Sequence, residues 1–158
     1  MDIHALAQLL GNFGEFIGAI AVVMTLAYLA VQVRQNTSAS NASGYRNAKS
    51  QLSMINTTVA QSAELTDIIE RALHSYVDLE PNEKARAGWV WLSYTNTWEA
   101  LFQESRESPG LQELWASEEA TMVIAFQMGG YRQWWQQNRF GGTREFRDHM
   151  EQLLGRVQ

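Results

Sequence analysis

A chain of 158 residues is long enough for one domain plus a membrane segment. Its mean hydropathy of −0.27 is that of a soluble protein, so the apolar character must be concentrated locally. The formal net charge of −5 argues against nucleic-acid binding, which needs a basic face to displace counterions. The absence of cysteine excludes disulfides, thiol catalysis and cysteine-based zinc sites.

The apolar character lies near the N-terminus. Residues 16–33 (FIGAIAVVMTLAYLAVQV) carry no charge, and about 18 apolar residues suffice for a helix to become a candidate membrane span. We therefore predict a transmembrane helix over residues 13–34, with residues 1–12 as an interfacial or helix-extending segment. A buried core helix and a cleaved signal peptide are the alternatives. The lack of a positive region before the run, and Arg34 directly after it, favour an uncleaved anchor.

Charge on the two sides of the predicted span indicates its orientation. Arg34, Arg46 and Lys49 follow the segment, whereas no Lys or Arg precedes it. By the positive-inside rule, the C-terminal domain is expected in the cytoplasm and the short N-terminus outside.

One face of this helix is lined by small residues. Their spacings of 4, 3, 4, 3 and 4 form a heptad-like stripe of Ala7, Gly11, Gly14, Gly18, Ala21 and Thr25. Small residues let helix backbones approach closely, which promotes association within lipid. The stripe predicts helix packing against a second copy or another membrane protein, although a Gly- and Ala-rich anchor without such a partner is the alternative.

A polar stripe lies beside the small one. His4, Gln8, Asn12 and Glu15 are spaced 4, 4 and 3 residues apart and share a helix face. In a ring of helices they would form the polar mouth of a pore. The simpler interpretation places Glu15 in the first turn of the span, where its charge favours the helix dipole.

The remaining chain is predicted to be all-α. Residues 35–44 are rich in Ser and Asn and indicate a polar linker or a helix continuation. Residues 45–158 are expected to form an α-helical cytoplasmic domain, a small bundle of about five helices after the membrane segment, which begins with an amphipathic stretch at Tyr45. Ser62, Pro81 and Thr143 are typical helix-start residues, and Gly129-Gly130 is expected to separate two helices.

Six tryptophans are concentrated in this domain. At helical spacing most of them are expected in the core. Adjacent side chains cannot point the same way, so one of Trp134 and Trp135 is predicted to be exposed, as an interface aromatic at a membrane surface or protein contact.

Residues suited to catalysis or metal binding are sparse. His4, His74 and His149 lack ligand spacing, and Glu118-Glu119 look like exposed helix acids. No phosphate-binding loop or nucleophile elbow is present. We therefore expect no enzyme activity, no catalytic or metal site and no cofactor.

The segment GEFIGAIAVVMTLAYLAVQVRQNT, residues 14–37, resembles the opening of a widespread family of small uncharacterised bacterial membrane-anchored helical proteins. SAELTDIIERAL, EPNEKAR, LQELW, YRQWWQQNRF and REFRDHMEQLL follow in the order expected for that family. The chain departs from it at Met128-Gly129-Gly130, where relatives tend to have a Pro-Gly-type helix start. The resemblance implies a bacterial inner-membrane location and supplies no active site.

These features favour a single-pass membrane protein acting as a homo-oligomeric or complex-associated accessory subunit. Its expected contacts are membrane lipid and either itself or another membrane protein, with no nucleic acid. One alternative is an oligomeric channel with Asn12 and Glu15 at its mouth. Another is a sensor that binds an apolar ligand within the helical bundle.

Overall fold

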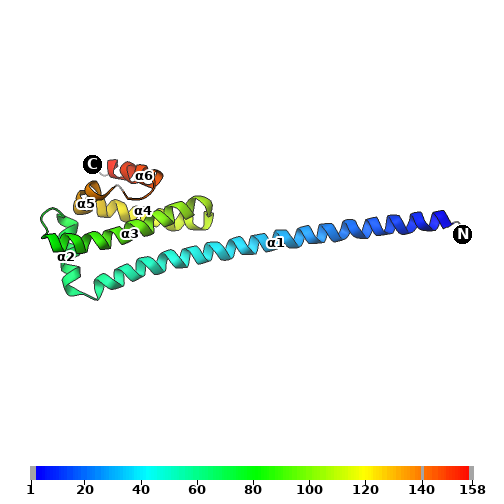
Figure 1. The fold of residues 1–158 in the computed structure, drawn as a ribbon, viewed down its shortest axis with the longest axis horizontal. Coiled ribbons are helices and arrows are strands. Elements are labelled where there is room, and N and C mark those ends of the chain that lie inside the picture. Colours follow the sequence, from blue (N-terminus) through cyan, green and yellow to red (C-terminus); the bar gives the residue numbers. More distant parts are fainter. Residues whose placement is uncertain (1–2, 140, 157–158) are drawn as a thin grey trace. The chain divides into compact units, whose positions relative to one another are not determined.

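The computed structural model describes residues 3–139 and 141–156, apart from the side chains of residues 5–7 and 9. This described part is all α-helical, as the sequence predicts. By its internal contacts the chain divides into two compact units, Met1–Ser40 and Asn41–Gln158. The helices of the described residues, labelled in Figure 1, are α1 (Ile3–Ala60), α2 (Ala63–His74), α3 (Pro81–Glu107), α4 (Pro109–Gln127), α5 (Gly130–Asn138) and α6 (Arg144–Gly155).

Helix α1 continues through residues 35–44, the polar stretch that the sequence leaves as linker or helix. The amphipathic segment from Tyr45 is therefore the last part of α1, as in the second of the two alternatives. No proline interrupts the stretch, and the Thr37 hydroxyl donates a hydrogen bond of 3.0 Å to the Val33 carbonyl one turn earlier. Such back-bonding lets a weak helix former remain inside a helix.

The core of the second unit is built around α3, which packs against α2 and α4. Helix α5 packs on α2 and α4, and α6 packs on α4. The last turns of α1 contribute Ala48 and Leu52, which are 8% and 6% exposed. The largest fully buried side chains come from α3 to α6 and are Trp135, Tyr131, Phe126, Phe146, Leu101, Leu111, Met122, Met150 and Leu153.

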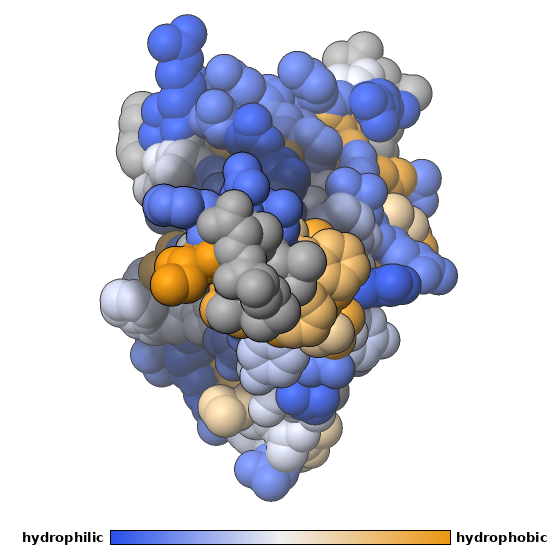
Figure 2. Space-filling view, turned by 90° about the vertical axis from the view of Figure 1, so that its right-hand side faces the viewer, coloured by the Kyte–Doolittle hydropathy of each residue, from blue (hydrophilic) through white to orange (hydrophobic). Residues whose placement is uncertain are grey.

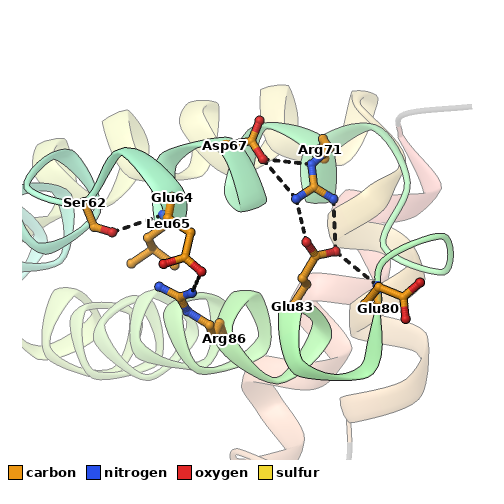
Figure 3. Close-up of polar contacts among 8 residues, drawn as sticks. All are labelled: Ser62, Glu64, Leu65, Asp67, Arg71, Glu80, Glu83 and Arg86. Atoms are coloured by element: carbon orange, nitrogen blue, oxygen red, sulfur yellow. Dashed lines mark hydrogen bonds and ion pairs between the residues drawn. The ribbon is translucent and has the colours of Figure 1, made fainter.

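The starts of α2 and α3 confirm two of the predicted helix signals (Figure 3). The Ser62 side chain accepts a hydrogen bond of 3.2 Å from the Leu65 amide. Pro81 occupies the first turn of α3. The Glu83 carboxylate accepts from the Glu80 amide at 3.1 Å and binds the Arg71 guanidinium at 2.7 and 3.0 Å. These contacts satisfy free amides at a helix start and join α2 to α3.

The junction between α4 and α5 requires glycine, because two backbones approach closely there. Gly129 has a φ of +86°, a region that side chains disfavour. A Cβ atom on Gly130 would lie 1.8 Å from the Ala72 carbonyl oxygen of α2. The predicted helix break at Gly129-Gly130 is confirmed, and it seats α5 directly against α2.

Thr143 precedes α6, but its side chain does not make the cap hydrogen bond that the sequence predicts. The Thr143 hydroxyl instead accepts a hydrogen bond of 3.1 Å from the side-chain amide of Gln103. The backbone N–H of Thr143 donates to the Glu99 carboxylate at 2.5 Å. Both partners lie on α3, so these bonds tie the start of α6 to α3.

Candidate functional site

The apolar segment of α1 is exposed along its length. Within the described residues, α1 is the one helix long and apolar enough to cross a membrane, with an 18-residue window of mean hydropathy 2.2 and none of it buried. Large side chains such as Phe16, Val23 and Leu26 are at least half exposed. Figure 2, viewed toward the N-terminal end of α1, shows hydrophobic side chains on opposite sides of the helix.

The stripe of small residues runs along this helix. A Cβ atom added at Gly11, Gly14 or Gly18 would meet no atom within 4 Å. The Thr25 hydroxyl donates to the Ala21 carbonyl at 2.8 Å, so that polar group is satisfied within the helix. The side chain of Ala7 lies outside the described residues. These glycines thus form an open surface without bulky side chains.

The polar stripe lies on the same helix. The side chains of His4, Gln8, Asn12 and Glu15 are all exposed, as are the other described side chains of residues 3–40. All four lie on α1. Among the described residues, no group of three or more His, Cys, Asp or Glu side chains is placed to hold a metal ion.

The tryptophan prediction is wrong in detail. Trp134 and Trp135 are 3% and 2% exposed, so neither is the expected interface aromatic. Trp134 packs on Trp91 and Tyr131, whereas Trp135 packs on Phe146 of α6. Helix α5 therefore has neighbours on two sides. The exposed tryptophan is Trp89 on α3, at 70%.

A cavity of about 560 Å³ lies within the second unit. Helices α1 to α4 each contribute side chains at helical spacing and α5 contributes one residue, and α2, α3 and α5 supply apolar and aromatic groups. The lining residues are Lys49, Leu52, Ser53, Asn56 and Thr57 of α1, Ile69 and Leu73 of α2, Trp91, Tyr94 and Trp98 of α3, Glu118, Thr121 and Ala125 of α4, and Tyr131 of α5.

An ion pair between α1 and α4 forms part of the lining of this cavity. The Lys49 ammonium lies 3.0 Å from Oε1 of Glu118, and the Trp98 indole N–H donates to Oε2 of the same carboxylate at 3.3 Å. Glu118 is only 8% exposed as a residue, which corrects the expectation of an exposed helix acid. The face of α4 that carries Glu118 also carries the buried Leu111, Trp115 and Met122. Burying a carboxylate without partners is costly, and these two donors offset that cost.

Hydroxyl groups complete the lining. Tyr131 bonds Thr95 at 2.6 Å between their hydroxyls, and burial raises the pKa of the Tyr131 phenol. Tyr94 donates to the Asn56 side chain, and burial followed by the Glu118 charge raises the pKa of Tyr94. Both phenols therefore stay neutral near pH 7 and act as hydrogen-bonding groups.

The sequence leaves ligand binding within the bundle as an alternative but does not identify the residues of this cavity, although their spacing carries a signal. Trp91, Tyr94 and Trp98 are spaced 3 and 4 residues apart, as are Glu118, Thr121 and Ala125. Each set therefore shares one helix face. Comparison with protein-family models, curated proteins and solved structures gives no match for the chain. The site therefore rests on its own geometry.

Proposed function

We propose that the chain is a single-pass membrane protein in which residues 13–34 of α1 cross the bilayer and the bundle is cytoplasmic. The observation that carries the proposal is the apolar segment, which is long enough to span and is exposed on all its faces within the chain. Exposed apolar surface of this extent is unfavourable in water and favourable in lipid.

The proposed orientation is tested with single cysteines, because the natural chain has none. Gln8→Cys and Ser38→Cys place one thiol before and one after the span. An impermeant maleimide added to spheroplasts labels only Gln8→Cys, and Ser38→Cys reacts after lysis. Labelling of Ser38→Cys alone from outside reverses the orientation. Extraction of the wild-type chain by alkaline carbonate contradicts a span.

We further propose that the span associates with a second copy or another membrane protein through the small-residue stripe. Gly14→Leu combined with Gly18→Leu places bulky side chains on the stripe and prevents close approach of a second helix. The variant is expected to convert oligomer to monomer in an uncharged detergent. Ala27→Leu is the matched control, since it enlarges a small residue on the opposite face. Equal effects of both variants, or a wild-type monomer without a co-purifying partner, oppose the stripe as the contact.

The proposed role is that of a non-catalytic accessory subunit in a bacterial inner membrane. Its support is the resemblance of residues 14–37 to small bacterial membrane-anchored proteins, together with the sparse catalytic residues of the sequence. Affinity purification of the tagged full-length chain from native membranes tests this role. Stoichiometric recovery of a membrane complex supports it, whereas recovery of the chain alone opposes it.

The cavity favours a second role, in which the anchored bundle binds a small molecule with an apolar body. A volume of about 560 Å³ with aromatic walls and a few polar groups is typical of ligand sites. Native mass spectrometry of the purified protein tests this role. A co-purified small molecule that Leu73→Trp displaces by filling the cavity supports it. Retention of the molecule by Leu73→Trp contradicts it.

A further inference from the structure

The cavity walls include four aromatic side chains that hold one another in place. Trp91 and Trp98 both pack on Tyr131, with ring centroids 5.4 and 6.0 Å apart, and Tyr94 packs on Trp98 at 5.6 Å. Three of the four are under 5% exposed, and Tyr94 is half-buried. Aromatic faces carry partial negative charge and attract cations.

The two charges at the cavity differ in how firmly they are held. The Glu118 side chain is 11% exposed, and its second oxygen accepts from the buried Trp98 indole. The Lys49 side chain is 44% exposed and lies on the last part of α1, which also supplies the exposed lining residues Ser53, Asn56 and Thr57. A lysine is flexible and readily hydrated, so its ammonium can leave for water while the carboxylate stays.

A departing ammonium leaves a buried carboxylate beside aromatic rings. An unpaired carboxylate in such a place is strongly unfavourable, so another cation that also buries apolar surface is favoured there. An anion would instead meet the fixed Glu118 charge. The lining hydroxyls and the Asn56 amide add hydrogen-bonding groups without net charge.

We propose that this cavity binds a small organic cation, an amine or quaternary ammonium with an apolar or aromatic body, whose charge replaces Lys49 beside Glu118. The apolar body lies between Ile69 and Leu73 of α2 and the aromatic wall of α3 and α5. The proposed cation site rests on ligand binding in the cavity, the second role proposed above, and specifies its chemistry.

Three isosteric probes test the charge preference. They are 3-phenylpropylammonium, 3-phenylpropanol and 3-phenylpropionate, titrated calorimetrically against the full chain in an uncharged detergent. The cation is expected to bind at least tenfold more tightly than the alcohol, and the carboxylate more weakly than both. Tightest binding of the carboxylate, or equal binding of cation and alcohol, overturns the cation site. Equal binding leaves the ligand-binding role standing, whereas no binding of any probe removes both.

Two variants test whether Glu118 and Lys49 determine the binding of the cation. Glu118→Gln is expected to weaken cation binding at least tenfold, and Lys49→Met is expected to strengthen it by removing the competing ammonium. Glu113→Gln removes an exposed carboxylate on the same helix outside the cavity and is expected to leave binding unchanged. If Glu118→Gln fails to fold, Lys49→Met still decides, because weaker cation binding in that variant overturns the proposal.

Discussion

Residues 3–40 and residues 41–156 differ in whether their large apolar side chains are exposed or buried. In the first unit large side chains such as Phe16 and Val23 stay exposed, whereas in the second Trp135, Phe146 and Met150 are at most 2% exposed. The second unit buries its apolar groups against other helices and stabilises itself. In the first unit these groups stay exposed within the described chain, and the proposed membrane span would cover them with lipid. Under the proposed membrane span, the single helix α1 therefore lies in two environments, lipid for its first part and the packed second unit for its last turns.

The largest effect should follow from charging the apolar segment. Val23→Arg combined with Leu26→Arg places two charges near the centre of the proposed span, at a cost of about 2.5–3.5 kcal/mol each for insertion. The variant should leave the membrane fraction, while the thermal unfolding of the bundle is unchanged. The control, Met54→Arg with Ile124→Arg, charges exposed apolar positions of the second unit and should stay in membranes. Membrane retention of the first variant would remove the contrast between the units.

The next largest effect is a difference in the free energy of unfolding between variants of two tryptophans of the bundle, one buried and one exposed. Trp135→Ala removes a side chain that is 2% exposed and should lower the free energy of unfolding by about 3–5 kcal/mol. Trp89→Ala removes one that is 70% exposed and should change it by less than about 0.5 kcal/mol. Chemical denaturation monitored by circular dichroism measures both. A large loss in Trp89→Ala would show that this surface is covered by a partner.

A smaller loss should follow from adding one methyl group at the α4–α5 junction. Gly130→Ala would place Cβ 1.8 Å from the Ala72 carbonyl oxygen, a backbone atom that can move only with α2. Separation of α5 from α2 should cost about 1–3 kcal/mol of unfolding free energy. Gly141→Ala is the matched control, because a Cβ there meets nothing within 4 Å. Equal stability of the two variants would mean that the close approach does not constrain the bundle.

Much of the helical layout was predictable, because its signals are local. Ser62, Pro81 and the Gly129-Gly130 pair act on the backbone of their own or neighbouring residues, so the sequence alone indicates where helices begin and end. The burial of both Trp134 and Trp135 was not predictable, because it depends on α6 returning to cover α5. Nor was the contact between Lys49 and Glu118, since 69 residues separate them and only tertiary packing brings them together. Periodicity shows which residues share a helix face, but not which faces meet.

The smallest expected effect is a dependence of bundle stability on pH. The Arg71 guanidinium, followed by the Glu80 amide, holds the pKa of the Glu83 carboxyl at about 2 in the folded chain. The pKa of glutamate in an unfolded chain is about 4.3, so folding favours the ionised form. The resulting stabilisation is complete above about pH 5 and is lost as the pH falls from there toward 2.

Thermal unfolding of the wild type and of Glu83→Gln across this range measures the contribution. The variant should be slightly less stable at pH 7 and show a flatter profile below pH 5, and Glu113→Gln should retain the wild-type slope. Because the pair is at the surface, added salt should narrow the difference. Since Arg71 and Glu83 join α2 to α3 within the second unit, the same titration should leave membrane association unchanged. Release of the chain from membranes in that pH window would instead show that membrane association depends on the stability of the second unit.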